Sequence, residues 1–394
     1  LAGSLPGWVG RPTTAAELTA MAIEAFELAS HGRLATVLIP QDLAWTEIGQ
    51  PHRPPAAVPV RPVPPPVDHT ADALRAAGRR ALVVLGGSAT GTSGLAAAAS
   101  VRSATGASVV ADYTTARLDL GVGSPGIEMH PYFPEPAREA LAADVVVLAG
   151  APAPVAYFGY RDQPSSLLMP AARVIDLGVG GADPVAALEA LADTLGSAAP
   201  SLVRGTGPTL PTSGPLTPAS ATRVFAAHQP AHAIVVEEAC TAAGDWADAA
   251  RLAPAFTVLC GGNGGSIGGG LPLAVGAAVA APDRRVMAIQ ADGSGAYTMQ
   301  ALWSMAREQL DVTVVVLANR RYRILELELD RSGLEPHGSA ARLTKLDGPP
   351  IDWVAIASGF GVAAATATTV DQLDAALSDA LGRPGPSLIE AVIA

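Results

Sequence analysis

Two stretches near the end of the chain predict its fold, Gln290-Ala291-Asp292-Gly293-Ser294 and Ala318-Asn319-Arg320-Arg321. A short, fully apolar run precedes each of them, Val286 to Ile289 and Val312 to Leu317. Continuous apolar runs separated by a helical pattern indicate parallel strands joined by a crossover helix. We therefore expect Asp292 and Asn319 at the carboxyl ends of neighbouring strands, the edge where open α/β sheets bind ligands.

These two side chains have the chemistry of a metal–phosphate site. A carboxylate, an amide oxygen and nearby backbone carbonyls are hard oxygen ligands that suit Mg²⁺ with a phosphate partner. Gly293 would let the backbone approach that phosphate closely. An Asp-Gly turn after a strand is by itself more often only a turn. The metal prediction therefore depends on the spacing to Asn319 and on the rest of the domain.

The composition excludes several classes of partner. The chain has 394 residues, of which 49% are hydrophobic and 15% charged, enough for two or three well-packed domains. The formal net charge of -11 argues against a nucleic acid or an anionic membrane as the main partner. No apolar stretch is long enough to span a membrane. Two cysteines, Cys240 and Cys260, suit a reducing cytoplasm. We therefore predict a cytoplasmic protein with no nucleic-acid or membrane partner.

Alternating strand and helix patterns predict an α/β fold with two Rossmann-like, doubly wound parallel-sheet domains, preceded by the tail of a third. Residues 1–50 hold one helix pattern and one strand, too little to enclose a core. They are interpreted as the end of a larger domain, with a small docked extension as the alternative. The remaining segments are predicted to be a proline-rich linker at 51–67, a central domain at 68–197, a second linker at 198–218 and a last domain at 219–394.

The central domain is predicted to be structural. Its first strand, Ala81 to Leu85, runs into Gly86-Gly87-Ser88-Ala89-Thr90-Gly91. This loop does not match the G-x-G-x-x-G fingerprint, and no acidic residue stands at the expected strand end. A dinucleotide site is the alternative, and with it an NAD-binding oxidoreductase, which the missing fingerprint disfavours.

A glycine-rich segment in the last domain, Gly261 to Gly270, leads into a helix pattern from Leu271 to Ala280. Such a loop can hold an anion at the helix N-terminus. Glycine clusters also mark tight turns and close helix packing, so the segment alone leaves both interpretations open. The acidic run Glu326, Glu328 and Asp330 is interpreted as a solvated helix face.

Three features of the last domain resemble the thiamine diphosphate-dependent enzymes of the acetolactate synthase and pyruvate decarboxylase type. Ala291-Asp292-Gly293-Ser294, with 26 residues between Asp292 and Asn319, is similar to the family's Gly-Asp-Gly…Asn-Asn cofactor signature. Gly265-Ser266-Ile267-Gly268 resembles the loop that bends the cofactor. Val236-Glu237-Glu238-Ala239-Cys240-Thr241 is similar to a turn that contacts the diphosphate. The resemblance covers the whole chain, and large-subunit-like acetolactate synthases are its nearest likeness.

The resemblance implies a role for each of these residues. Asp292 and Asn319 would ligate Mg²⁺ through side-chain oxygens, and Arg321 would do so through its backbone carbonyl. Gly265 would accept a hydrogen bond from the pyrimidine amino group, and Ile267 would separate the two rings of the bent cofactor. The other residues implied to bind the cofactor are Thr241, Ser266, Gly293 and Ser294.

The chain departs from the family pattern at several positions. Ala291 and Ala318 replace the usual glycine and first asparagine, but neither position supplies a metal ligand. Leu325 falls where pyruvate decarboxylases carry a glutamate, which favours a carboligase or a decarboxylase of another branch. The glutamate that activates the pyrimidine ring lies early in the family's first domain. We therefore expect this chain to be N-terminally truncated, to bind the cofactor weakly alone and to be inactive alone.

The leading hypothesis is a thiamine diphosphate- and Mg²⁺-dependent carboligase or decarboxylase of small 2-oxo acids, acetolactate synthase-like. This chain would supply the diphosphate half of the site. A benzoylformate-decarboxylase-like lyase and a non-catalytic partner subunit are the alternatives. Because the family builds its active sites between two subunits, the resemblance implies a homodimer or homotetramer. The pyrimidine domain would then come from the complete chain.

Overall fold

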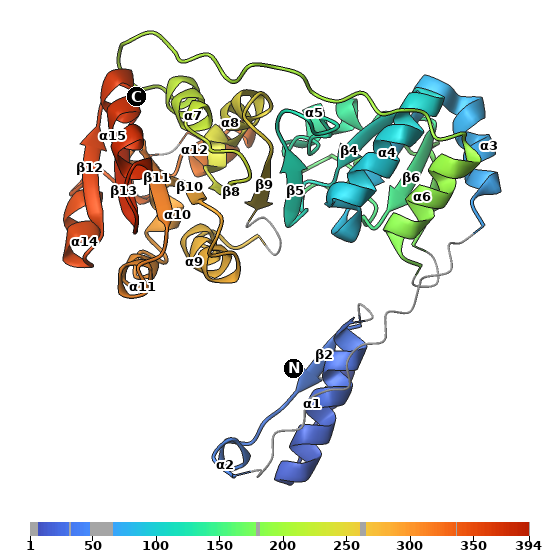
Figure 1. Cartoon of the computed structure of the whole chain (residues 1–394), viewed down its shortest axis with the longest axis horizontal. Helices are drawn as coiled ribbons and strands as arrows, with labels where there is room; N and C mark the ends of the chain where they lie inside the picture. Colours follow the sequence, from blue (N-terminus) through green and yellow to red (C-terminus); the bar gives the residue numbers. More distant parts are fainter. Residues whose placement is uncertain are drawn as a thin grey trace. The chain divides into compact units, whose positions relative to one another are not determined.

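The computed structural model describes residues 7–30, 33–47, 66–178, 182–260, 265–335 and 337–393. They fall into two compact units, Leu1–Val63 and Pro64–Ala394, and each unit is described by itself (Figure 1). The predicted proline-rich linker lies almost entirely outside the described residues. No helix in the described part of the chain is long and apolar enough to cross a membrane.

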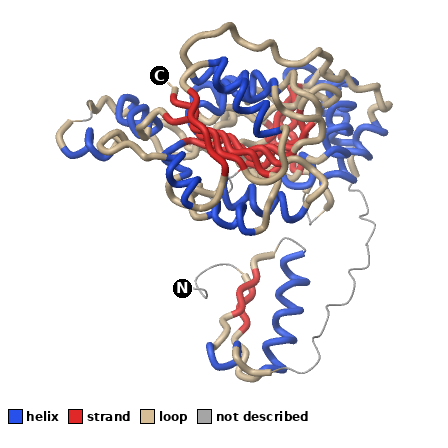
Figure 2. Tube along the Cα trace, turned by 60° about the vertical axis from the view of Figure 1, so that its left-hand side comes forward, coloured by secondary structure: helices blue, strands red, loops and turns tan. Residues whose placement is uncertain are grey.

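The first unit consists of a short parallel strand pair and the helix that joins the two strands (Figure 2). Helix α1 begins at Ala15, directly after Thr14, whose hydroxyl accepts a hydrogen bond from the Glu17 amide at 3.2 Å. Phe26, Leu34 and Ile39 stay exposed, so the described part of this unit does not enclose a full core. The elements are β1 (Trp8–Gly10), α1 (Ala15–Ser30), β2 (Ala35–Val37) and α2 (Gln41–Ala44).

The second unit begins with a four-stranded parallel sheet in the order β4-β3-β6-β7. Helices α4 and α6 pack side by side against it (Figure 1). Its strands are β3 (Ala81–Leu85), β4 (Ser108–Ala111), β6 (Val145–Ala149) and β7 (Arg173–Asp176). Its helices are α3 (Asp68–Ala77), η2 (Gly78–Arg80), η3 (Gly87–Thr90), α4 (Thr92–Thr105), α5 (Pro134–Ala140) and α6 (Pro184–Thr194).

A seven-stranded sheet follows within the described residues, in the order β12-β13-β11-β10-β8-β9-β5. Its strands are β5 (Arg117–Leu120), β8 (Ile234–Glu238), β9 (Phe256–Cys260), β10 (Val286–Ala291), β11 (Val312–Ala318), β12 (Ala363–Ala367) and β13 (Ser387–Val392). The helices are α7 (Pro218–Ala227), η5 (Cys240–Ala242), α8 (Ala243–Ala250), α9 (Gly270–Ala280), α10 (Asp292–Gly295), α11 (Ala301–Arg307), α12 (Arg323–Arg331), α13 (Ser339–Leu343), α14 (Trp353–Gly359) and α15 (Val370–Leu381).

Helices cover both faces of this sheet (Figure 2), as predicted for a doubly wound fold. Side chains alternate along each strand between two apolar clusters. On β10, Met287 and Ile289 belong to the cluster that includes α7, α8 and α15. Val286 and Ala288 belong to the cluster that includes α9, α11 and α14. The predicted α/β class with parallel sheets is therefore confirmed.

Strand β5 differs from the other strands of this sheet because it pairs antiparallel with β9. It follows β4 in the chain, so a segment of the predicted central domain completes the sheet of the last domain. Its residue Leu118 is fully buried opposite Val258. One apolar cluster consequently extends from β3 of the first sheet to β10 of the second. The sequence analysis does not predict this strand.

Candidate cofactor and metal site

Asp292 connects the carboxyl ends of two neighbouring strands. It follows β10 directly, and in the parallel register Ala291 lies opposite Leu317 of β11. The side chain is only 3% exposed. Its Oδ1 accepts from the Gly293 amide at 2.8 Å, and its Oδ2 accepts from the Arg320 amide at 2.7 Å. Arg320 adopts the left-handed region with φ 58°, a conformation that a non-glycine residue keeps only when its contacts demand it.

The surroundings of Asp292 fit a bound cation. Burial raises the pKa of Asp292, while hydrogen bonds from the Arg320 and Gly293 amides lower it. The net shift in pKa is upward, so the hydrogen bonds from these amides only partly offset the burial of the carboxylate. A divalent cation would offset the remaining desolvation cost, and carboxylate oxygen is a ligand that Mg²⁺ prefers.

The other two predicted metal ligands lie in the turn that Asp292 holds. Asn319 Oδ1 accepts from the Arg321 amide at 3.0 Å. Arg320 and Tyr322 make backbone hydrogen bonds of 2.8 Å to residues 346 and 344, so the Arg321 carbonyl faces away from that segment. The described residues contain no group of three or more His, Cys, Asp or Glu that could hold a metal. The predicted metal ligands Asp292, Asn319 and Arg321 are not such a group, because they combine one carboxylate with an amide oxygen and a backbone carbonyl oxygen.

The residues predicted to contact the diphosphate surround the same turn. Ser294 is buried, and its hydroxyl accepts from Gln290 Nε2 at 2.7 Å and donates to the Ala291 carbonyl at 3.2 Å. Thr241 is exposed in η5, next to Cys240, whose Sγ lies 3.9 Å from Ser294 Oγ. The structure thus brings Thr241 and Ser294 into one neighbourhood.

The structure gives a different reason for glycine at position 293. A Cβ on Gly293 would lie 2.5 Å from Cε1 of Tyr322 and 3.3 Å from Leu346. Close packing of Tyr322 therefore already requires glycine here. The sequence pattern predicts that this glycine allows a phosphate to approach, but the packing of the protein alone already requires it.

The predicted ring-binding loop is described from Gly265 onward, and residues 261–264 lie outside the described residues. Gly265 and Gly268 have φ values of 69° and 93°, which favour glycine. Between them, Ser266 is exposed and Ile267 is 42% exposed, although its side chain is apolar. An apolar side chain projecting from a glycine loop is what the predicted separation of two cofactor rings requires.

Glu238 is a buried residue of this site to which the sequence analysis assigns no role. Its Oε1 accepts from the amides of Gly268 and Gly269 at 2.8 and 3.1 Å. Its Oε2 accepts from the amide of Gly270 at 3.1 Å and from Gln290 Nε2 at 2.6 Å. The protein's own carboxylate therefore occupies the N-terminus of α9, where the sequence left an external anion as one interpretation. The sequence feature from which this role could have been predicted is the pair Glu237 and Glu238 at the end of a buried strand.

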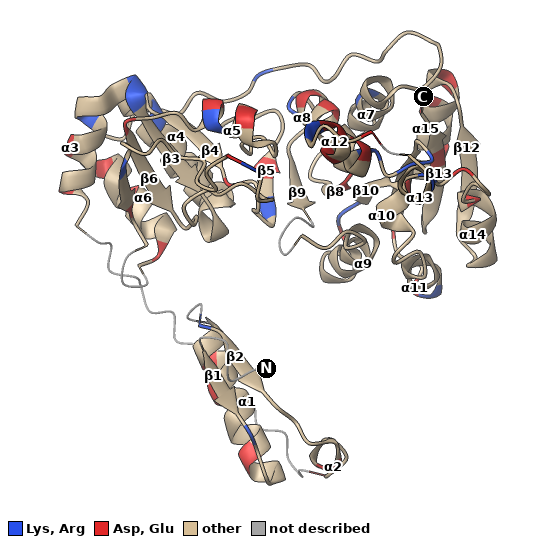
Figure 3. Cartoon of the chain, turned by 180° about the vertical axis from the view of Figure 1, so that it is seen from behind, with Lys and Arg blue, Asp and Glu red and all other residues tan. Residues whose placement is uncertain are grey.

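Helix α12 carries acidic residues (Figure 3), and the burial of one of them, Glu326, corrects the interpretation of the acidic run as a solvated face. This glutamate is 7% exposed and lies 3.4 Å from both Arg323 and Lys345 and 3.7 Å from Arg321. A buried carboxylate is tolerated here because three cations surround it. The Glu326 contacts join α12 to the turn that carries the predicted metal ligands.

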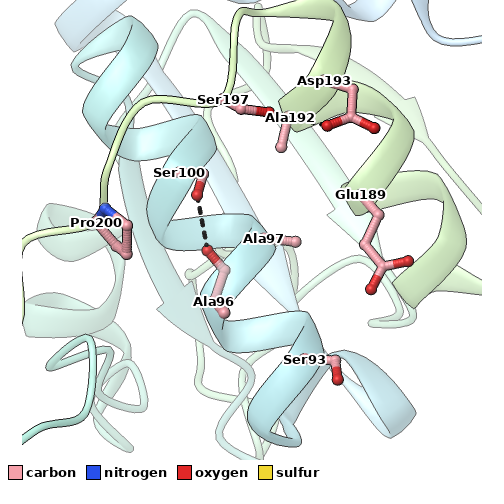
Figure 4. A pocket seen from close by; sticks show the side chains of 9 residues that line it. All are labelled: Ser93, Ala96, Ala97, Ser100, Glu189, Ala192, Asp193, Ser197 and Pro200. Atoms are coloured by element: carbon pink, nitrogen blue, oxygen red, sulfur yellow. Dashed lines mark hydrogen bonds between the residues drawn. The ribbon is translucent and has the colours of Figure 1, made fainter.

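A shallow groove of about 540 Å³ between α4 and α6 is not a plausible cofactor site (Figure 4). Small side chains such as Ala97 and Ser100 form much of it, and the carboxylates of Glu189 and Asp193 line it. No basic side chain is among the described residues of its lining. Two carboxylates would repel a diphosphate or a 2-oxo acid.

Comparison with known proteins identifies the family. Residues 241–391 match the family model described as "Thiamine pyrophosphate enzyme, C-terminal TPP binding domain". A Mycobacterium tuberculosis protein described as "Putative acetolactate synthase large subunit IlvX" is 41% identical over 402 residues, which cover 100% of this chain and 76% of the relative. The chain belongs to the thiamine diphosphate-dependent enzymes. The predicted family and its cofactor thiamine diphosphate are thereby confirmed.

Two further members of this thiamine diphosphate family resemble the chain. Benzoylformate decarboxylase of Pseudomonas aeruginosa is 36% identical over 184 residues, 45% of this chain and 32% of that enzyme. The solved structure of a thiamine diphosphate-dependent 4-hydroxybenzoylformate decarboxylase from Rhodococcus jostii RHA1 superposes with a TM-score of 0.76 at 23% identity. It covers 98% of this chain and 76% of that structure, and it shows a shared fold.

Proposed function

We propose that this chain supplies the diphosphate half of a thiamine diphosphate- and Mg²⁺-dependent active site for 2-oxo acids. The observation that carries the proposal is the buried Asp292 carboxylate, held between two strand ends beside Asn319. Thiamine diphosphate, when bound, supplies the carbanion chemistry that cleaves or forms the bond next to a 2-oxo group.

The chain's own residues would bind and orient the cofactor. Asp292 and Asn319 would hold Mg²⁺ through side-chain oxygens, with the Arg321 carbonyl as a further ligand. The diphosphate would be bound by Thr241, Gly293 and Ser294. Because Ser294 Oγ already hydrogen-bonds Gln290 and Ala291, its hydroxyl would exchange one of these partners for a phosphate oxygen.

The Gly265–Ile267 loop would position the rings of the cofactor. The Gly265 carbonyl would accept from the pyrimidine amino group, and Ile267 would keep the two rings apart. Ser266 lies between them and is exposed. Glu238 would keep the loop in place, since its carboxylate is bonded to the three amides that follow Ile267.

The reaction that we propose first is acetolactate synthase-like carboligation, because the relative that spans the whole chain is described as such a subunit. Benzoylformate-decarboxylase-like cleavage is the second candidate, favoured by the 36% identity to that enzyme. Product analysis with pyruvate separates carboligation from simple cleavage. Acetaldehyde without acetolactate would rule out the carboligase.

Assembly into a homodimer or homotetramer is part of the proposal. Val279, Tyr297 and Trp303, on or beside α9 and α11, are large apolar side chains left exposed, as is Ile267 in the cofactor loop. A second subunit that completes the active site would cover them. A cytoplasmic location remains a prediction, and both cysteines are free in the structure.

The decisive experiment is a calorimetric titration of thiamine diphosphate into the protein, with Mg²⁺ and with a chelator. Binding that requires Mg²⁺ is expected. Absence of Mg²⁺-dependent binding, in the assembled oligomer as well as in the 394-residue chain, would overturn the proposal. A parallel turnover assay of the 394-residue chain tests the expectation that it is inactive alone.

A further inference from the structure

Three tyrosines lie together at the carboxyl edge of the first sheet. Tyr113 follows β4, Tyr132 precedes α5 and Tyr157 follows β6. Their ring centroids are 5.2 Å apart for Tyr113 and Tyr132, 5.4 Å for Tyr132 and Tyr157, and 6.3 Å for Tyr113 and Tyr157. Burial raises the pKa of Tyr113, with a further contribution from Glu237 at the end of β8. The tyrosine cluster therefore borders the cofactor half of the unit.

Tyr157 contacts the predicted cofactor loop directly. A Cβ added to Gly265 would lie 1.8 Å from the Tyr157 hydroxyl oxygen. Gly265 is the residue proposed to bind the pyrimidine amino group. If the cofactor binds as proposed, the Tyr157 hydroxyl lies beside its reacting end.

A cavity of about 100 Å³ lies against the same tyrosines. All three tyrosines line it, together with Pro152, Pro154 and other residues. Val155 in its lining is 62% exposed, so the cavity opens to solvent. Its volume is about that of three waters, more than a methyl group fills.

The cavity also contains an unsatisfied polar atom. His130 lines it and is 5% exposed. Its Nδ1 lies 3.0 Å from the Pro131 carbonyl oxygen. Its Nε2 lacks a hydrogen-bond partner among the described residues, although it is 3.5 Å from Asp112 Oδ2. The Asp112 carboxylate faces this nitrogen, so a ligand that brings only an aromatic ring into the cavity leaves His130 beside a polar partner.

We propose that this cavity receives the side chain of the 2-oxo acid and selects an aromatic side chain over methyl. The inference rests on the proposed function, which brings the reacting end of the cofactor to Gly265, and it favours the second of the two candidate reactions, cleavage of an aromatic 2-oxo acid. Aromatic rings pack favourably edge-to-face against other aromatic rings, and tyrosines form the wall on the cofactor side. The methyl group of pyruvate would leave most of the cavity unfilled. Tyr157 is thus a specificity-determining residue.

The test is a binding measurement on the 394-residue chain, made with thiamine diphosphate and Mg²⁺ and repeated without them. Calorimetry compares benzoylformate with pyruvate. Benzoylformate is expected to bind at least about tenfold more tightly. Tyr157→Ala should reduce this preference at least about fivefold, whereas Tyr157→Phe, which keeps the ring, should retain most of it. Val174→Ala is the control, since Val174 is exposed on β7 and does not line the cavity.

The outcomes separate the two proposals. Equal or tighter binding of pyruvate, undetectable benzoylformate binding, or an unchanged preference in Tyr157→Ala would overturn this inference. A preference that falls equally in Val174→Ala would also overturn it, and melting curves verify that each variant is folded. Loss of Mg²⁺-dependent cofactor binding with the aromatic preference retained would contradict the proposed function alone.

Discussion

At the scale of single residues, the candidate site depends on two buried carboxylates with different tasks. Asp292 holds two strand ends together and would present oxygen to the proposed metal ion. Glu238 accepts hydrogen bonds from the amides at the start of α9 and thereby keeps the glycine loop in one conformation. Both carboxylates are satisfied by backbone amides, which is why a sheet edge can bury them.

Replacing Asp292 by asparagine tests the contribution of its negative charge while the size of the side chain stays the same. Asp292→Asn keeps the size of the side chain but removes the negative charge that Mg²⁺ needs. We expect Mg²⁺-dependent binding of thiamine diphosphate to weaken by about 100-fold or more. Folding stability should fall by about 1–3 kcal/mol, because the new NH2 group cannot accept from one of the two backbone amides. Calorimetric titration measures the affinity. Asp330→Asn, an exposed aspartate on α12, is the control, and parent-like affinity of Asp292→Asn would exclude this residue as a metal ligand.

Glu237 makes stability depend on pH. Burial raises the pKa of Glu237 to about 7, and the neighbouring charge of Glu238 adds to this rise. Because the folded state binds its proton more tightly than the unfolded state, stability should fall as pH rises from about 4.5 to 7 and then level off. The free energy of unfolding should decrease by an amount on the order of 3 kcal/mol across this pH range.

Urea denaturation of the parent and of Glu237→Gln, at several pH values across that window, measures this effect. Glutamine can still accept from the Ala239 amide, which lies 2.7 Å from Glu237 Oε1. The variant should lack this part of the pH dependence and should be more stable than the parent above pH 7. Identical pH profiles for the two proteins would show that Glu237 is not the titrating group.

At the scale of elements, α12 connects the two sheets of the second unit. Arg331 forms two 2.9 Å hydrogen bonds with Glu135 of α5, and its guanidinium lies 4.9 Å from the ring centroids of both Phe133 and Tyr160. The Tyr160 hydroxyl donates to Glu328 at 3.1 Å. These contacts hold the loop that carries Tyr157 next to the cofactor loop.

Substitutions at Arg331 test this connection. Arg331→Ala should cost about 1–2 kcal/mol of unfolding free energy, since it removes the two hydrogen bonds from Nη2 to Glu135 and two ring contacts. Arg331→Lys should recover only part of this free energy, because an ammonium group lacks the planar face that packs against Phe133 and Tyr160. Urea denaturation provides the free energies. Arg161→Ala is the control, because Arg161 is exposed and follows Tyr160 in the chain. An equal loss of unfolding free energy in Arg161→Ala would argue against a specific contribution from the Arg331 contacts.

At the scale of the whole molecule, β5 joins the two sheets into one folded unit. A segment that follows β4 of the first sheet pairs with β9 of the second. One continuous apolar cluster contains both Leu85 of β3, in the first sheet, and Ile289 of β10, in the second. Residues 64–394 are therefore stabilised jointly.

Leu118→Ala tests the joint core. Deleting this fully buried side chain should cost about 2–5 kcal/mol. Hydrogen exchange measured by mass spectrometry should show reduced protection in both β3 and β9. Val174→Ala, an exposed position on β7, should leave protection unchanged. A loss of protection confined to one sheet would contradict a shared core.

The sequence by itself determined the class of the fold, most strands and helices of the second unit, and the meeting of Asp292 with Asn319. These features follow from local patterns, because runs of buried apolar residues predict strands and parallel strands end at a common edge. The sequence does not predict the alanine-rich strand β12, because Ala363–Ala367 contains no β-branched or aromatic residue apart from one threonine.

Only the tertiary structure decided which distant side chains complete the site. Glu238 meets Gly268 and its neighbours across 30 or more residues, Tyr157 meets Gly265, and Glu326 becomes buried because Arg321, Arg323 and Lys345 surround it. The antiparallel β5 likewise depends on a contact with β9, far along the chain. Periodicity records which face of an element is buried, but not which other segment covers it, and for that reason these contacts could not be predicted.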